Sequence, residues 1–271
     1  SDCGIESGRG SSASSVTSYF SGGGSISIKG ASGATGGDGL CFDNGTIMYA
    51  NSGTISLIGA STSGLGLQLS RNPTTTSTSN FFSSSTSSPA ITMTGTSSTT
   101  WGVLSAYARS TSNAVYVQST AASGGGITIN GTTGATYANT SGFGDINLNS
   151  TNLLSANGAI TLNSNATNVA YGGITIGGNN TASAATASYS ISTFGSCLVS
   201  ACGDSLVTST AANFVANTDI WYGLVNTTTA GTPSIFNTSG SVTFTPKATT
   251  GFRYFVTDNM QMGTSVGALT I

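Results

Sequence analysis

This 271-residue chain has four cysteines, whose side chains could form disulfides or bind zinc. An even number of cysteines in a chain rich in Ser and Thr favours two disulfides and an oxidising compartment. Zinc binding is the alternative, but zinc sites usually take Cys and His at short, paired gaps, and the chain has no His. We therefore expect no metal site and no cofactor. The cysteines are Cys3, Cys41, Cys197 and Cys202.

Groups suited to catalysis are scarce. Without His, a Ser–His or Cys–His nucleophile cannot be assembled within this chain. A glycosidase needs two carboxylates a few ångströms apart. Outside the N-terminal segment the close acidic pair is Asp38 and Asp43, which corner hydrogen bonds explain better. Lyases of acidic polysaccharides need clustered Lys and Arg with bound calcium, whereas the basic residues here are isolated and no EF-hand or calcium nonapeptide occurs. We expect no enzymatic activity, and a polysaccharide-active enzyme is the least favoured alternative.

Composition and charge exclude further classes of partner and of protein. Charged residues make up 5% of the chain and the net charge is −2, so there is no basic surface for nucleic acid or anionic lipid. No run of about 18 apolar residues occurs, which argues against membrane insertion. The hydrophobic content of 37% excludes the disordered class. Because the sequence begins without Met or a leader, we expect a processed piece of a longer protein.

A short motif, apolar–polar–apolar after a small residue, recurs along the chain. It appears as SISIKG, TISLIG, AITMTG, GITING and AITLNS, and its first apolar residues are 29, 36, 36 and 33 residues apart. These intervals are regular enough to indicate a repeat and loose enough to leave room for loops of variable length. The first apolar residues are Ile26, Ile55, Ile91, Ile127 and Ile160.

Each interval holds two further apolar patches, exemplified by GLCF and GTIMYA in the first interval. Three patches per interval indicate three short strands per coil. Two apolar side chains on one face cannot stabilise a strand alone, but equivalent strands stacked about 4.8 Å apart bury a continuous core. The sequence thus predicts a parallel β-solenoid with coils of roughly 29–36 residues. A β-sandwich also has many short strands, but it does not explain the longer period.

The middle residue of each motif should point to water and form one polar ladder along the solenoid. Such a strip could contact glycans, another filament or ice. We interpret it first as a structural ladder. Ice binding usually uses two parallel Thr columns on a flat face, and it is disfavoured because only one column here is flanked by inward apolar residues. The ladder consists of Ser27, Ser56, Thr92, Thr128 and Thr161.

The segments ISIKGASGATGGDGLCF, TISLIGASTSGLGLQL and AITMTGTSSTTWGVL, followed by GITINGTTGAT, resemble the repeats of filamentous-haemagglutinin-type large exoproteins. Members of that family are secreted bacterial adhesins with right-handed parallel β-helix shafts. The resemblance covers residues 21 to about 178. It implies an extracellular or cell-surface fibrous protein that is exported through a partner pore in the outer membrane. It identifies a shaft rather than the ligand of that shaft.

The chain divides by pattern into three parts. Residues 1–20 are expected to be an entry or capping segment, 21–178 regular coils, and 179–271 an aromatic-richer continuation with a loop insertion near 180–215. A separate C-terminal domain is the alternative. The last residues, ALTI, repeat the motif, so we expect continuation or end-to-end docking there. A self-assembling filament subunit is therefore the alternative function, and homotypic ends, glycans and host or neighbouring-cell surfaces are the expected partners.

The strand pattern also predicts how the cysteines pair. Leu40 and Phe42 match the inward positions of the GLQL strand, so Cys41 should point outward, as Gln68 does. Cys3 precedes the first motif and is expected to have no strand partner. We predict that a Cys3–Cys41 disulfide pins the entering chain over the first coil, and that Cys197 pairs with Cys202 across a short loop.

Overall fold

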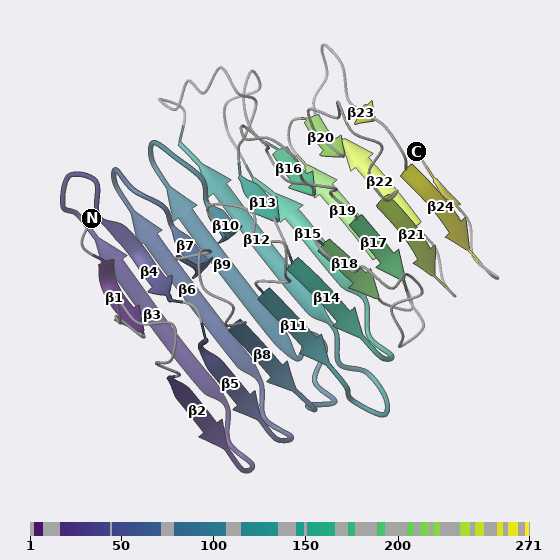
Figure 1. Ribbon diagram of the computed structural model, residues 1–271, viewed down its shortest axis with the longest axis horizontal. Helices are drawn as coiled ribbons and strands as arrows, with labels where there is room; N and C mark the ends of the chain where they lie inside the picture. The colour runs from purple at the N-terminus through teal and green to yellow at the C-terminus, as the bar shows by residue number, and fades with distance from the viewer. Residues whose placement is uncertain are drawn as a thin grey trace.

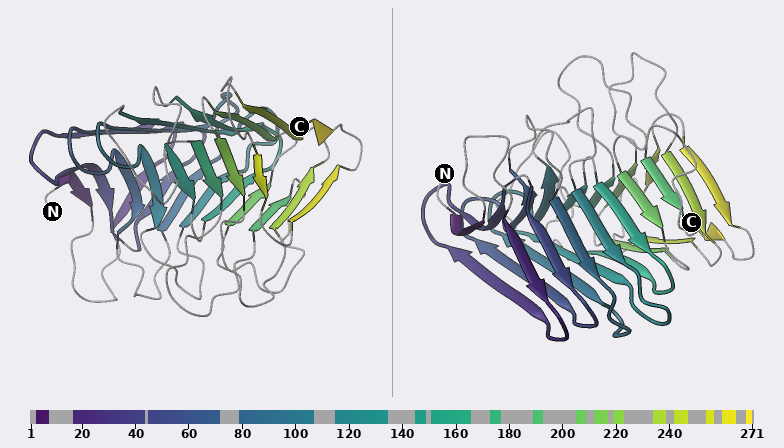
Figure 2. Two further views of the ribbon diagram at one scale, coloured as in Figure 1. Left: turned by 90° about the horizontal axis from the view of Figure 1, so that it is seen from above. Right: turned by 60° about the horizontal axis from the view of Figure 1, so that its bottom comes forward.

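The strands of the protein stack into three parallel sheets, in a computed structural model (Figure 1). One strand of a coil enters each sheet in turn, and Figure 2 shows the strands following one another along the long axis. The structure describes residues 3–7, 17–43, 45–71, 79–106, 115–134, 145–148, 151–165, 173–176, 189–192, 205–208, 212–216, 219–222, 234–238, 242–246, 254–256, 260–264 and 269–270.

Sheet A has eight strands, which in spatial order are β1 (Cys3–Ser7), β4 (Asp38–Phe42), β7 (Leu67–Ser70), β10 (Val103–Ala106), β13 (Ile146–Leu148), β16 (Gly173–Ile176), β20 (Asp219–Tyr222) and β23 (Tyr254–Val256). Sheet B has nine, which are β2 (Ser18–Ser21), β5 (Ile47–Ala50), β8 (Ser79–Ser83), β11 (Val115–Ser119), β14 (Thr151–Ser155), β18 (Ser205–Thr208), β17 (Tyr189–Ser192), β21 (Ser234–Thr238) and β24 (Met260–Thr264).

Sheet C has eight strands, and its N-terminal members are the longest in the molecule. From the N-terminal end it contains β3 (Ile26–Ser32), β6 (Ile55–Ser61), β9 (Ile91–Ser97), β12 (Ile127–Thr133), β15 (Ile160–Ser164), β19 (Ala212–Ala216), β22 (Val242–Pro246) and β25 (Leu269–Thr270).

This architecture confirms the predicted parallel β-solenoid with three strands per coil. The first apolar residues of the five motifs lie opposite one another in sheet C, so the intervals read from the sequence are the lengths of the coils. No described residue is helical. Within those ranges, accordingly, no helix has the length and apolar character needed to cross a membrane.

Alternation along each strand builds one apolar core between the sheets. In β12, Ile127 and Ile129 are fully buried, whereas Thr128 between them is half-buried on the outer face. Sheets A and B contribute the two largest fully buried side chains, Phe42 and Phe81. Their rings pack edge to face, with centroids 5.3 Å apart. Burial of such side chains contributes about 1.5–3 kcal/mol each. The stacked motif therefore supplies the stability that a single strand lacks.

Buried hydroxyls hold the corners where strands end. The Ser97 Oγ, at the end of β9, donates a hydrogen bond of 2.7 Å to the Gly64 carbonyl of the preceding coil. The same oxygen accepts the N–H groups of Thr99 and Thr100 at 3.1 and 2.8 Å. Ser61 makes the equivalent contacts one coil earlier. Since buried backbone groups need partners, these corners explain part of the unusual Ser and Thr content.

Glycines allow sheets A and C to approach closely at one corner. Gly30, Gly59, Gly95 and Gly131 lie opposite one another in sheet C. A Cβ atom added at any of them would overlap a backbone carbonyl of sheet A or of the residue leading into it; at Gly95 this is the Gly102 oxygen. Only a residue without a side chain fits there.

The entering segment differs from the prediction. It was expected to have no strand partner, but residues 3–7 form β1, which pairs with β4 so that Ile5 lies opposite Leu40. Residues 18–21 form β2 and pair with β5. These strands were missed because they lack the repeated motif, and only their place beside the next coil makes them strands.

Strands from the C-terminal part continue the same three sheets. β19 pairs with β15, and β20 pairs with β16, in register. Sheet B departs from chain order here, since β18 lies between β14 and β17. Much of the predicted insertion near 180–215 lies outside the described residues, and the predicted boundaries at 20 and 178 stay predictions.

The glycine corner gives a test with a matched control. We expect Gly95→Ala to lower the free energy of unfolding by about 1–3 kcal/mol, because the added methyl group must displace backbone. Gly22→Ala should change it by less than about 0.5 kcal/mol, since a Cβ atom there meets nothing within 4 Å. Denaturant unfolding of both variants measures the difference. Equal effects would contradict the close approach of the two sheets.

Candidate functional site

The predicted polar ladder lies on the outer face of sheet C. The strand register places its five residues directly opposite one another. The first member is exposed and the remaining four are half-buried. Neighbouring side chains of a ladder are about 4.8 Å apart, the spacing of strands. The members are Ser27, Ser56, Thr92, Thr128 and Thr161.

A second column, which is polar except at Ile58, runs beside the first and was not predicted from the sequence. It is formed by residues two positions further along each strand, and its later members are joined by side-chain hydrogen bonds. The Asn163 amide donates to the Asn130 oxygen at 2.8 Å, and the Asn130 amide donates to the Thr94 hydroxyl at 3.4 Å. The seven-residue length of these strands, visible in ITMTGTS and ITINGTT, was the available clue.

A third column completes the outer face of sheet C. It places Thr96 opposite both Ala60 and Thr132. The central strands β9 and β12 thus present three outward polar side chains each. These two further columns were not predicted, because only the middle residue of each motif was considered. Apart from Lys29, the side chains in these columns are uncharged, so the face can donate and accept hydrogen bonds but offers no acid–base pair.

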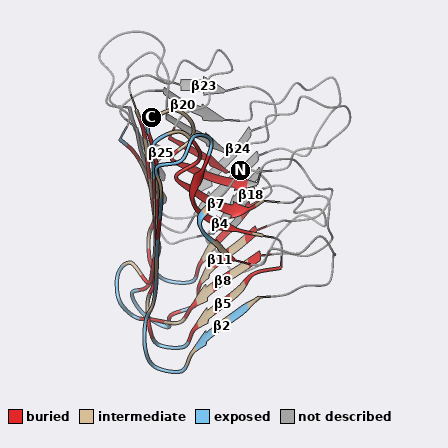
Figure 3. Ribbon diagram, turned by 90° about the vertical axis from the view of Figure 1, so that its left-hand side faces the viewer, coloured by how far each residue is buried: buried red, intermediate tan, exposed pale blue. Residues whose placement is uncertain are grey.

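Sheet B carries a different outer column, made of aromatic side chains. The rings of Tyr49 and Phe82 stack with centroids 4.5 Å apart and an interplanar angle of 2°. Phe20 follows at 6.2 Å from Tyr49 and is 71% exposed. Figure 3 shows its strand, β2, as an exposed edge at the N-terminal end.

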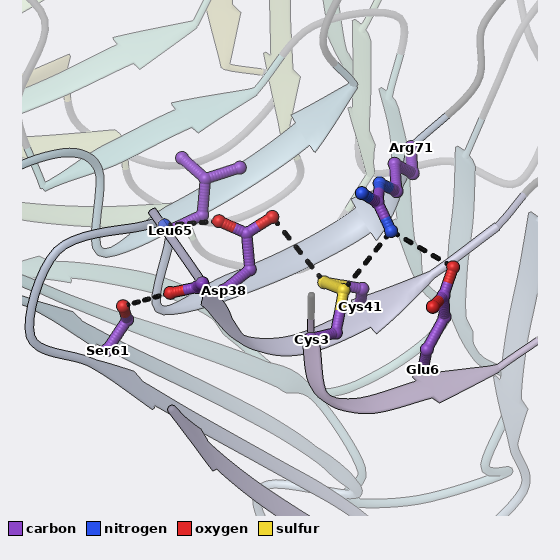
Figure 4. The surroundings of a disulfide bond; sticks show 8 residues. Cys3, Glu6, Asp38, Cys41, Ser61, Leu65 and Arg71 are labelled. Carbon is purple, nitrogen blue, oxygen red and sulfur yellow. Dashed lines mark hydrogen bonds and ion pairs between the residues drawn. A yellow bond between two sulfur atoms is a disulfide. The ribbon is translucent and has the colours of Figure 1, made fainter. Parts of the chain in front are cut away.

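The predicted Cys3–Cys41 disulfide is confirmed (Figure 4). Its Cα atoms are 6.1 Å apart and it links residues 38 positions apart. Cys41 lies opposite Gln68, as predicted, but it is fully buried. The expectation of an outside crossing was wrong, because the bond joins neighbouring strands β1 and β4 of one sheet.

Charged side chains surround this disulfide on both sides (Figure 4). The Arg71 Nη1 lies 3.4 Å from the Cys3 Sγ and 3.0 Å from the Glu6 Oε1. On the other side, the Asp38 Oδ2 lies 3.6 Å from the Cys41 Sγ. These residues are far apart in sequence, and strand pairing brings them together.

Asp38 is a buried carboxyl group, 6% exposed. Its Oδ1 accepts the Leu65 N–H at 2.7 Å, so the side chain bonds to the next coil rather than within its own turn. Burial raises the pKa of Asp38 above its ordinary value, although the Leu65 hydrogen bond and the positive charge of Arg71 act in the opposite direction. A proton is therefore held more tightly here than on an exposed Asp.

Cys3, Asp38 and Cys41 are also the one group of three possible metal-binding side chains among the described residues. Their ligand atoms lie within 4.8 Å of one another. A metal requires thiolates, and neither sulfur is a thiolate in the disulfide. In this oxidised state the group cannot ligate a metal ion. Cys197 and Cys202 lie outside the described residues, so their predicted pairing stays a prediction.

No protein-family model matches the chain, and comparisons with curated proteins and with solved structures gave no match. The β-solenoid is consistent with the shafts that the repeats resemble, and the adhesin family itself stays a prediction. The function must therefore be argued from the outer faces, the ends and the disulfide of this chain.

The disulfide gives a stability prediction. Replacing both cysteines, as Cys3→Ser with Cys41→Ala, should lower the free energy of unfolding by about 2–4 kcal/mol, because the unfolded chain loses a long closed loop. Chemical unfolding with and without a reductant measures the free energy of unfolding. The variant has no Cys3–Cys41 bond, so the reductant cannot destabilise it by breaking that bond. Peptide mapping that links Cys3 to Cys197 or Cys202 would contradict the pairing.

Proposed function

We propose that the chain is a non-enzymatic, extracellular structural segment, the shaft of a secreted adhesive fibre. The observation that carries this proposal is the outer face of sheet C. Ser, Thr and Asn side chains are held there in register on successive strands. A glycan or a glycan-coated cell surface is the partner that this chemistry suits.

Rigidity is the first argument for a contact surface. Each strand of the face is paired on both sides from β6 to β22, so the spacing of its hydroxyl and amide groups is fixed by the backbone. A partner that binds such a surface does not have to pay the entropy of ordering it. Individual hydrogen bonds contribute about 0.5–1.5 kcal/mol net, and a long repeated face can add many of them.

Charge and compartment support the same proposal. With a net charge of −2 and 5% charged residues, the chain has little long-range electrostatic attraction for any partner. Hydroxyl-rich neutral polymers bind instead through short hydrogen bonds and apolar contacts. The Cys3–Cys41 disulfide favours an oxidising compartment such as the extracellular space. The absence of His from the sequence supports a role without nucleophilic catalysis.

Adsorption to polysaccharide films tests the proposal. Films of cellulose, mannan and alginate on a quartz-crystal sensor supply three glycan chemistries. We expect adsorption to at least one film, and we expect the triple variant Thr92→Val, Thr94→Val, Thr128→Val to reduce it several-fold. Valine keeps the β-branched shape and removes only the hydroxyl.

The matched control carries the same three changes in exposed turns, at Thr62, Thr86 and Thr120. It should adsorb as the unmodified protein does. The proposal is contradicted if the unmodified protein adsorbs to none of the three films, or if both triple variants lose adsorption equally.

A second candidate function, end-to-end assembly into filaments, rests on the N-terminal end. Among the described residues, β1, β2 and β3 each pair with another strand on one side only. Phe20 and Ile5 are the exposed large hydrophobic side chains among the residues whose burial is described, and both belong to these strands. Unpaired edges with apolar side chains are templates for further strands.

Sedimentation velocity tests this candidate. The unmodified chain should form elongated oligomers that increase with concentration. Phe20→Lys, and separately removal of residues 269–271, should each shift it toward the monomer, because they alter opposite ends of the stack. Thr86→Lys adds the same charge in an exposed turn and should leave the oligomers unchanged. A monomer at every concentration would contradict end-to-end assembly.

A further inference from the structure

The two sulfurs of the Cys3–Cys41 disulfide lie in unlike surroundings. Cys41 is fully buried, whereas Cys3 is half-buried on β1, the end strand of sheet A. An external thiol can therefore reach Cys3 more easily. We propose that this disulfide is an exchange site for an external dithiol, in which the attack falls on the Cys3 sulfur.

Arg71 favours attack at Cys3. The attacking group is a thiolate, and negative charge spreads over three sulfurs in the transition state of exchange. The Arg71 guanidinium lies 3.4 Å from the Cys3 Sγ and can stabilise that charge, as well as the Cys3 thiolate formed later. Glu6 shares the same guanidinium nitrogen at 3.0 Å and partly neutralises it. The two side chains should therefore act in opposite directions on the rate.

Asp38 lies beside the other sulfur, that of Cys41. Its Oδ2 faces the Cys41 Sγ at 3.6 Å, and a disulfide sulfur has no proton to donate to it. Once the bond is broken, Cys41 is a buried sulfur, and a buried thiolate is costly. A protonated Asp38 can supply the proton at that moment, and the resulting thiol can then donate a hydrogen bond back to the carboxylate. The site is thus arranged for the reduced form as well as the oxidised one.

The exchange balances as follows. One thiolate of the dithiol forms a bond to the Cys3 Sγ, the Cys3–Cys41 bond breaks, and its electron pair leaves on Cys41, which takes a proton from Asp38. The second thiol of the reagent loses its proton, which restores the acid at Asp38 through solvent, and attacks the reagent's own sulfur in the mixed disulfide. Cys3 leaves as a thiolate beside Arg71. The dithiol is oxidised to a disulfide, and the protein gains a thiol at Cys41 and a thiolate at Cys3.

Reduction would remove the covalent link between β1 and β4. Among the described residues β1 pairs with β4 alone, and it is also held by the Arg71–Glu6 ion pair and by a hydrogen bond of 3.0 Å from the Tyr19 hydroxyl to the Ser7 Oγ. Exchange at Cys3 therefore acts on the end of the solenoid and leaves the inner coils unchanged. This inference is independent of the glycan-binding proposal, since no residue of the outer face of sheet C takes part.

The experiment uses the full, folded chain in native buffer. Glutathione, a monothiol, traps the mixed disulfide for peptide mapping, and dithiothreitol, a dithiol, gives the rate of reduction. We expect the glutathione adduct on Cys3. Arg71→Gln should slow reduction several-fold, Arg71→Lys should retain most of the rate, and Glu6→Gln should increase it. Asp38→Asn should also slow it, while keeping an acceptor for the Leu65 N–H.

Lys29→Gln is the control for net charge, because Lys29 is exposed on sheet C. It should reduce at the unmodified rate. An adduct on Cys41 would overturn the proposal. So would a reduction rate equal to the rate of global unfolding, or an equal loss of rate in Lys29→Gln and Arg71→Gln. If Arg71→Gln fails to fold, the expected acceleration in Glu6→Gln still decides the role of the guanidinium.

Discussion

Register between successive coils is the constraint on which the rest of the structure depends. In a parallel stack each residue must lie beside its counterpart in the next coil, and a shift by one position would turn the apolar side chains to water. The buried column from Ile55 to Ile160 and the outward column from Ser56 to Thr161 are two results of one pairing. The glycine column at the corner with sheet A is a third, since the close approach recurs at the same position in each coil.

Much of this architecture was predictable from local pattern. The five motifs predicted the register of the first five strands of sheet C to the residue, and the patches between them predicted strands of the other two sheets. The Cys3–Cys41 pair was predicted correctly, but from a crossing outside the coil, whereas the bond joins two neighbouring strands of sheet A. β1 was not predictable in this way, because a single apolar residue, Ile5, faces the core side of its register. Its strand identity comes from the neighbouring coil rather than from its own sequence.

The side chains around the disulfide could not be predicted from the sequence, because only the folded structure brings them together. Arg71 and Glu6 are 65 residues apart, and no spacing rule connects them. They meet because Glu6 lies opposite Cys41 in sheet A, Cys41 lies opposite Gln68, and Arg71 follows β7 directly. The second polar column was closer to being predictable, since Thr94 and Asn130 continue the alternation of their strands. It was missed because the motif was read as three residues rather than seven.

The end of a solenoid has a physical problem that its interior does not have. An inner strand is paired on both sides, whereas among the described residues β1 pairs with β4 alone. The chain places its buried disulfide and the Arg71–Glu6 ion pair on this strand. A half-buried ion pair contributes little by itself, so the covalent bond is the main addition. The same strand therefore combines one-sided pairing with a covalent link that can be reversed, and the stability of β1 is coupled to the redox state of two sulfurs.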